Sequence, residues 1–320
     1  MIKVGIIGAD SLIAGELLRL LINHPETDII SLYAPMVAGR SVSSIHHGFI
    51  GESLVNFSEK ITPESLDILF ITQKSDFADH IFENQENWPA LKIIDLTNDN
   101  ERAFNNKLSA IGLSEINRKP LVRGSMKAYV PSPDLVAPLI ALVPLASYML
   151  LNGPLSVSLS IPSAILKEDG VKKANSRYLY EALNLFQPSF SSSLNLSFEE
   201  NKEESRVISM HLIIDCPLSI EEIERIYEGV YDDHNFTFIV HSPVSVKEVE
   251  GTQKCIISLN KPSSATLEIT VIIDGRMRGG AGDGVHMLDL LTGLHEKTGL
   301  TLKSSAYDAP SKTQSSSWFA

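Results

Sequence analysis

The hydrophobic pattern changes its period within the first 25 residues of the chain. Residues 2–7 form a short apolar run rich in β-branched side chains, which is typical of a buried strand. Gly8 follows, and from Gly15 apolar residues recur at helical spacing until Pro25 ends the pattern. A strand, a glycine-containing turn and a helix in this order predict the opening of a dinucleotide-binding α/β domain.

The rest of the first half continues this alternation. Apolar runs at 28–33, 67–71 and 92–96 have the length of buried strands, and polar loops follow the last two of them. A further helix is predicted to begin at Pro133, because Ser132 is a good N-cap and proline suits the first helical position. Strands alternating with helices predict a Rossmann-like parallel sheet.

The second half has a different pattern. Apolar and polar residues alternate at 155–161 and again at 208–214, as in half-buried strands. Further strands are predicted at 236–240, 254–259 and 266–273. Many strands with few helices between them predict an α+β domain with a mixed or antiparallel sheet.

These patterns divide the chain into parts. We expect a Rossmann-like domain at 1–135 and an inserted α+β domain of catalytic or dimerisation type at 136–281. A final helix at 282–310 is expected to pack back on the first domain, and a serine-rich tail at 311–320 is expected to be disordered. The segment 172–204 is polar and poorly periodic, and its structure is not predicted.

Charge and composition narrow the functional classes. The net charge of −12 argues against nucleic acid or an anionic membrane as a partner. The longest apolar run, 135–151, contains Pro138 and Pro144, which argue against a transmembrane span and predict a kinked helix. The two cysteines, Cys216 and Cys255, lie in apolar runs without metal-ligand spacing, so we expect a reduced, cytoplasmic protein without a metal.

The turn after the first strand is the candidate cofactor site. Ser11 stands where the middle glycine of a dinucleotide loop would lie, and Asp10 adds negative charge near the expected phosphates. Residues 34–36 offer no side chain that binds a ribose diol or a 2′-phosphate, and Arg40 is only a weak substitute. The candidate cofactor contacts in this turn are Gly8, Asp10, Ser11, Leu12 and Ile13.

Several stretches in both halves carry a family resemblance. They are Lys3–Pro25, Ala38–His46, Ile93–Leu96, Ile111–Arg118, Lys254–Leu259, Ile273–Leu291 and Thr298–Lys303. In this order and at roughly this spacing they resemble N-acetyl-γ-glutamyl-phosphate reductases. These are NADP-dependent enzymes of arginine biosynthesis related to aspartate-semialdehyde dehydrogenases. The resemblance implies a Rossmann domain, an inserted α+β domain, and a last helix that returns to the first domain.

The resemblance also implies where the chemistry should lie. In that family a cysteine at a helix start attacks the acyl phosphate, and Pro133 takes its place here, without a nucleophilic atom. The family's general-base histidine lies in a His-x-His-x-Pro-Glu segment of the second domain. Between Ile161 and Leu212 the only histidine is His211, inside a predicted strand, so that segment is missing.

Three candidate residues remain from the resemblance. Arg206 matches an arginine that holds the substrate, Arg278 matches a lysine near the cofactor, and Gly279 is a candidate cofactor contact beside it. Either arginine could equally belong to a structural ion pair. An arginine also differs from a lysine in its geometry and hydrogen bonding, so the two do not replace each other without consequence.

Three functional hypotheses remain open. The first is a catalytically degenerate family member that is kept as a binding or partner subunit, with NADP as a candidate cofactor. The second is an active NADP-dependent reductase with a rearranged site, which would need Cys216 or Cys255 as its nucleophile. The third is a module that binds another small molecule in the cleft between the domains.

The second domain is also the expected assembly surface. Its alternating strands would present apolar faces, and the resemblance implies that this sheet forms much of the subunit interface. We therefore expect a homo-oligomer through the second domain, and a mixed assembly with an active relative is a further expectation.

Overall fold

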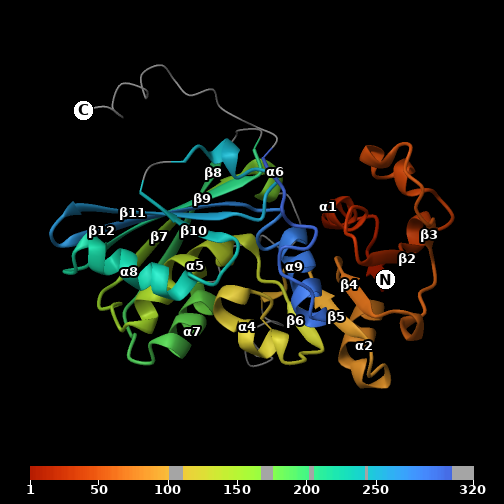
Figure 1. Ribbon diagram of the computed structural model, residues 1–320, viewed down its shortest axis with the longest axis horizontal. Helices are drawn as coiled ribbons and strands as arrows, with labels where there is room; N and C mark the ends of the chain where they lie inside the picture. The colour runs from red at the N-terminus through yellow and green to blue at the C-terminus, as the bar shows by residue number, and fades with distance from the viewer. Residues whose placement is uncertain (101–110, 167–175, 202–204, 242–243, 305–320) are drawn as a thin grey trace, which may run out of the picture.

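The computed structural model describes residues 1–100, 111–166, 176–201, 205–241 and 244–304. The expected disordered tail at 311–320 lies outside these ranges. Figure 1 shows two sheets side by side, with helix α9 between them. No helix of the described residues is long and apolar enough to cross a membrane.

The first sheet has six strands in the order β3-β2-β1-β4-β5-β6, and every pair is parallel. This confirms the predicted Rossmann-like sheet. Its central strands are buried on both faces, which explains their uninterrupted apolar runs. The strands are β1 (Ile2–Ile7), β2 (Thr27–Tyr33), β3 (Phe57–Ser58), β4 (Ile68–Ile71), β5 (Lys92–Asp95) and β6 (Lys127–Tyr129).

The helices of this half connect the parallel strands. Helix α1 (Leu12–Leu21) begins three residues before the predicted helical run at Gly15, because the Ser11 side chain caps it. Among the described residues of this half, the others are α2 (Asp76–Glu83) and α4 (Ser114–Val122). Short 3₁₀ turns of the chain lie at Pro35–Val37, Val42–Ser44, His47–Phe49, Pro63–Ser65, Gln85–Asn87 and Val246–Glu248.

The second sheet has six strands in the order β10-β11-β12-β9-β7-β8, with both parallel and antiparallel pairs. This confirms the predicted mixed sheet. The strands are β7 (Leu155–Pro162), β8 (Leu194–Asn201), β9 (Val207–Asp215), β10 (Thr237–Val240), β11 (Cys255–Ser263) and β12 (Thr266–Asp274). The helices that the structure describes beside this sheet are α5 (Pro133–Ser147), α6 (Ser163–Leu166), α7 (Ser176–Phe186) and α8 (Ile220–Tyr231).

One face of this sheet is covered by α5, α7 and α8, which Figure 1 shows gathered on the same side. The apolar residues at alternate positions of β7 and β9 pack against these helices in one core. The faces on which we based an oligomer are therefore this chain's own core. Those faces are not available for contacts between copies of the chain.

Helix α5 continues through both of its prolines. Pro144 has no N–H for the carbonyl of Ile140, and that carbonyl instead accepts a hydrogen bond from the Tyr231 hydroxyl at 2.6 Å. Tyr227 donates in the same way to the carbonyl of Ala141 at 2.6 Å. Two tyrosines of α8 thus satisfy the backbone of a proline-containing helix and fix α8 against α5.

The last helix, α9 (Ala281–Thr292), returns to the first sheet. It contacts α1, α4 and β5, and its apolar residues belong to the same core as those of β1 and β4. The loop just before α9 therefore lies where the two halves of the chain meet.

Candidate functional site

The turn after β1 is tied to its neighbouring strands. Gly8 has φ +76°, and a Cβ there would lie 2.5 Å from the Cβ of Gln73, so only glycine fits. The N–H groups of Gly8 and Ala9 both donate to the carbonyl of Tyr33, at 3.0 and 3.1 Å. These two amides are therefore not free for a phosphate.

Ser11 completes the turn by capping helix α1. Its Oγ accepts from the N–H of Ala14 at 3.2 Å and donates to the Thr72 hydroxyl at 3.0 Å. The serine that replaces the expected glycine therefore supports the start of the helix instead of blocking it. The N–H groups of Leu12 and Ile13, in the first turn, have no acceptor within the helix and can bind an anion.

The turn fits a phosphate group in part. The amides at the start of α1 are suitable donors, but the half-exposed carboxylate of Asp10 lies one residue before the cap and repels an anion. Beyond β2, the side chain of Met36 is 90% exposed, and the guanidinium of Arg40 donates to the carbonyl of Ser44 at 3.3 Å. Within the described ranges, no group of three or more His, Cys, Asp and Glu side chains could hold a metal ion.

Pro133 is the first residue of α5 and is buried. A Cβ on Gly279 would lie 2.5 Å from its nitrogen and 2.6 Å from its Cα, so these two candidates are in direct contact. Ser132, just before it, is clamped by Asn100, whose Nδ2 donates to the serine Oγ at 2.8 Å. The Ser132 N–H in turn donates to Asn100 Oδ1 at 3.2 Å, so both ends of the amide side chain are used.

Both cysteines are buried. Cys255 lies on β11 with no exposed surface, and burial raises the pKa of its thiol to about 12. Cys216 follows β9 and donates its N–H to the carbonyl of Ala265 at 2.7 Å. Burial and a raised pKa make Cys255 a poor nucleophile at neutral pH, and Cys216 is buried as well, so neither cysteine presents an accessible thiol to a substrate.

Arg206 joins the two halves of the chain. Its guanidinium lies 2.8 Å from a carboxylate oxygen of Glu16 on α1 and 3.1 Å from one of Asp274 at the end of β12. Burial lowers the pKa of Arg206, but Asp274 and Glu16 outweigh it and raise the net value. Glu16 also binds Arg19 at 2.6 Å. The candidate substrate arginine therefore serves as an ion-paired tie between α1 and the second sheet.

Arg278 is completely buried and paired with two carboxylates. One Nη lies 2.6 Å from Glu115 of α4, and the other lies 3.2 Å from Asp283 of α9. Glu115 also accepts from the hydroxyl of Thr237 on β10 at 2.7 Å, and Asp283 accepts from the N–H of Gly279 at 2.7 Å. We call Arg278, Glu115 and Asp283 the buried ion cluster. It connects α4 and α9 to the second sheet.

The structure thus places most of the candidates in two groups. The first is the turn from Gly8 to Ile13, and the second is Pro133 with Arg278 and Gly279. The sequence analysis did not identify Glu115 or Asp283. A charged residue in a glycine-rich stretch was a usable signal for Asp283, whereas Glu115 lies among other polar residues and gives no such signal. His46 was also missed, and its Nε2 lies 2.8 Å from the carbonyl of Ala9.

Comparison with known proteins gives the family. Residues 3–123 match the model of the semialdehyde dehydrogenase NAD binding domain. The chain is 33% identical to N-acetyl-gamma-glutamyl-phosphate reductase of Parabacteroides distasonis over 330 aligned positions, covering 96% of this chain and all of the relative.

Solved structures show the same fold at low identity. Aspartate semialdehyde dehydrogenase II of Vibrio cholerae aligns with a TM-score of 0.70 at 12% identity, over 92% of this chain and 99% of that one. The Candida albicans enzyme with NADP aligns with a TM-score of 0.67 at 13% identity, over 91% and 98%. The expected resemblance is confirmed over nearly the whole length, and the chain belongs to the N-acetyl-gamma-glutamyl-phosphate reductase family.

Proposed function

We propose that this chain is a family member without reductase activity, kept as a binding or partner subunit. The observation that carries the proposal is Pro133 at the first turn of α5, the position that the resemblance assigns to the nucleophilic cysteine. In this chemistry the acyl group must first become a thioester of the enzyme before a hydride can reduce it. A buried proline has no atom that can form that bond.

The proton-transfer group is missing as well. His211, the only histidine of its segment, lies on β9 and binds Glu268 of the neighbouring strand at 2.8 Å. Its ring is on the sheet face opposite α5, so it cannot serve a reaction at the start of that helix. Loss of both nucleophile and base lowers activity by several orders of magnitude in comparable enzymes.

We expect no turnover when the purified protein is assayed with N-acetylglutamate semialdehyde, phosphate and NADP⁺ by the appearance of NADPH. The Parabacteroides distasonis relative, assayed in parallel, is the positive control. The Pro133→Cys variant should also stay inactive, because the base is absent. A wild-type rate within about a hundredfold of the control would sink the proposal.

The proposal retains a nucleotide site at the start of α1. The family model that the chain matches is named for NAD binding, and the amides of Leu12 and Ile13 can bind a phosphate. Bound NADPH would supply a hydride, which this chain cannot use without a nucleophile. Asp10 opposes the negative pyrophosphate, so we propose weak binding and expect Asp10→Asn to strengthen it.

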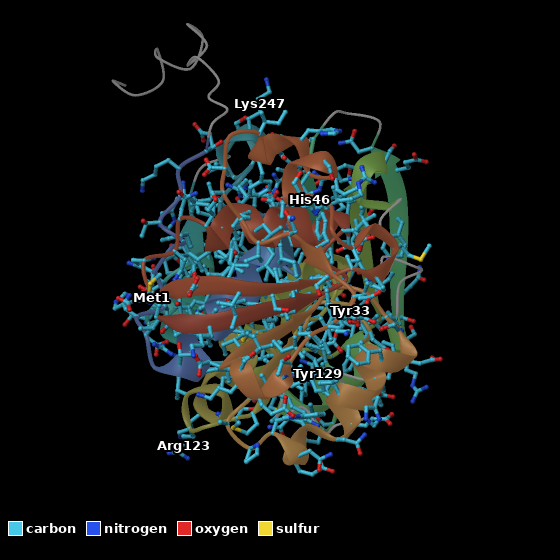
Figure 2. The ribbon with its side chains drawn as sticks, turned by 90° about the vertical axis from the view of Figure 1, so that its right-hand side faces the viewer. Met1, Tyr33, His46, Arg123, Tyr129 and Lys247 are labelled. Carbon is cyan, nitrogen blue, oxygen red and sulfur yellow. The ribbon has the colours of Figure 1, made fainter. Side chains whose placement is uncertain are left out.

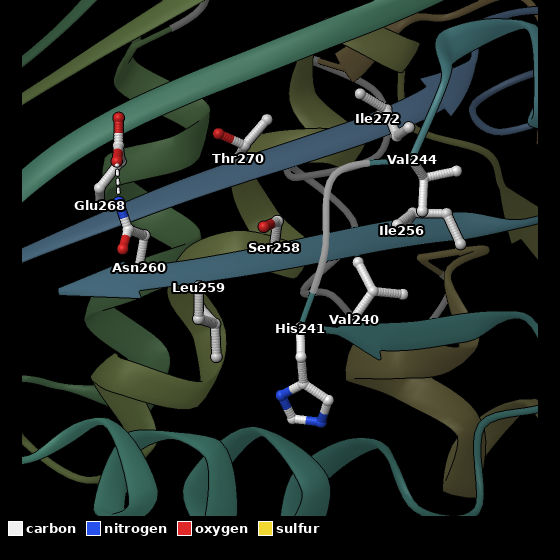
Figure 3. A pocket seen from close by; sticks show the side chains of 10 residues that line it. All are labelled: Val240, His241, Val244, Ile256, Ser258, Leu259, Asn260, Glu268, Thr270 and Ile272. Atoms are coloured by element: carbon white, nitrogen blue, oxygen red, sulfur yellow. Dashed lines mark hydrogen bonds between the residues drawn. The ribbon is translucent and has the colours of Figure 1, made fainter. Parts of the chain in front are cut away.

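We also propose that copies of the chain assemble through the second sheet. The support is the face opposite α5, where Ile213 is 53% exposed near the middle of the sheet. The same face carries a hollow of about 460 Å³, lined by apolar side chains of β10 to β12 and by Ser258 and Thr270. Figure 3 shows these lining side chains. An active relative with the same face could join a mixed assembly, because loss of the catalytic residues leaves this surface unchanged.

Light scattering coupled to gel filtration should give the mass of a homodimer or homotetramer at tens of micromolar protein. Ile213→Asp should lower that mass by placing a charge on the contact face. Leu185→Asp is the matched control, because Leu185 is 55% exposed but lies on α7, on the other side of the sheet. A strictly monomeric wild-type protein would refute the assembly.

A further inference from the structure

We propose that His46 is a positioning residue of the nucleotide site, which fixes the Ala9–Asp10 peptide so that the Asp10 N–H is presented to an anion. This inference rests on the proposed nucleotide site. His46 comes from the connection between β2 and β3, 37 residues beyond the carbonyl that it binds. Figure 2 shows Met1 and Tyr33 toward opposite ends of the first sheet, with His46 above the strands.

The hydrogen bond of His46 defines both its tautomer and the peptide orientation. The ring Nε2 lies 2.8 Å from the carbonyl oxygen of Ala9, and a carbonyl can only accept, so Nε2 carries the proton. The peptide that follows Ala9 is trans. The C=O and N–H of a trans peptide point in opposite directions, so the N–H of Asp10 is directed away from His46.

The Asp10 amide is the one that this turn leaves for a ligand. Among residues 8–11, the N–H groups of Gly8 and Ala9 donate to Tyr33, and that of Ser11 donates to the carbonyl of Gly8 at 2.9 Å. Within the described part of the chain, the Asp10 N–H has no such acceptor. Together with the first-turn amides of α1 it forms the set of donors that phosphate sites use.

The imidazole ring is held by its surroundings. A Cβ on Gly15 would lie 2.8 Å from its Nδ1, so the ring is packed directly against α1 and requires glycine there. The rings of Phe49 and Phe57 lie beside it in edge-to-face arrangements, with ring centroids at 6.4 and 6.2 Å. Because the imidazole is confined in this way, it cannot turn away from the carbonyl of Ala9. The hydrogen bond therefore also fixes the Ala9–Asp10 peptide.

Two substitutions of His46 distinguish the effect of its hydrogen-bond donor from the effect of its ring packing. His46→Gln keeps an N–H donor within reach of the Ala9 carbonyl, whereas His46→Phe keeps a flat ring against Gly15 and removes the donor. NADPH affinity is measured by fluorescence titration in the wild-type chain and in an Asp10→Asn background, with thermal denaturation to show that each variant is folded. We expect His46→Phe to weaken binding about tenfold and His46→Gln to stay within about twofold of its parent.

Two other results of this titration would reject the role of His46. If His46→Phe and His46→Gln weaken NADPH binding equally, or if His46→Phe has no effect, His46 does not position the Ala9–Asp10 peptide. The proposed nucleotide site still stands in that case. If neither the wild type nor Asp10→Asn binds NADPH at millimolar concentration, the proposed nucleotide site is wrong, and the role of His46 is rejected with it.

Discussion

Replacing Glu115 with Gln is expected to lower the free energy of unfolding by about 3–5 kcal/mol, because it leaves one side of a buried guanidinium without its charge partner. Glu115 is 7% exposed, and Arg278 has no exposed surface. The substitution preserves the shape of the side chain, so the loss reports charge and not volume. Urea denaturation at neutral pH measures it.

The matched control is an exposed ion pair. Glu181 binds Arg177 at 2.7 Å on α7, but their side chains are 42% and 70% exposed. Glu181→Gln should therefore cost about 0.5 kcal/mol or less. A loss below about 1 kcal/mol in Glu115→Gln would contradict our account and would mean that Asp283 alone compensates Arg278.

The effect of Glu115 should also depend on pH in a defined direction. Burial would raise the pKa of this carboxyl, but Arg278, with weaker contributions from neighbours including His234, outweighs it and holds the value at about 2. An unfolded glutamate titrates near about 4.3. When the pH falls, the unfolded state is thus protonated first, so the difference in stability between wild type and Glu115→Gln should be complete above about pH 5 and fade toward pH 2. A constant difference over this range would contradict the assignment.

The two arginines support the proposed loss of activity in a second way. The resemblance gives Arg206 and Arg278 roles near substrate and cofactor, yet each is neutralised by two carboxylates of this chain. A cation already paired on both sides attracts an anionic ligand weakly. The same residues hold the two halves together, which agrees with our proposal that the chain keeps the family fold without its reductase activity.

The fold could be predicted from local patterns because each pattern has one physical cause. Parallel strands that are buried on both faces have continuous apolar sequences. Apolar and polar residues alternate along β9 because only one of its faces is buried. Helix α7 and strand β8 were missed, since both lie in the segment that seemed polar and aperiodic as a whole. Strand β8 is an edge strand with many exposed residues, so its apolar signal is weak.

The site could be predicted from the sequence only where the interacting residues are close together in the chain. Gly8 and Ser11 lie a few residues apart, and their roles follow from turn and cap chemistry. The partners of Arg206 and Arg278 are not local, because Glu16 is 190 residues from the first and Glu115 is 163 from the second. Whether a charged residue binds a ligand or closes an ion pair depends on such contacts, which no sequence pattern records.

The second large effect concerns the close contact between Gly279 and Pro133. Gly279→Ala is expected to destabilise the protein by about 2–5 kcal/mol, from a left-handed backbone angle and a steric clash together. Its φ is +75°, and the new Cβ would meet the nitrogen and Cα of Pro133. These are backbone atoms at the start of α5, so no side-chain rotation relieves the clash. Thermal and urea denaturation would measure the loss.

Gly293→Ala separates the two causes. Gly293 also has φ +75°, at the end of α9, but a Cβ there would meet nothing within 4 Å. Both substitutions restrict the unfolded chain equally, so their difference isolates the contact with Pro133. We expect Gly293→Ala to cost about 1 kcal/mol and Gly279→Ala clearly more. Equal losses would mean that the loop before α9 moves away from α5 without cost. The close contact between Gly279 and Pro133 would then contribute nothing to the stability of the protein.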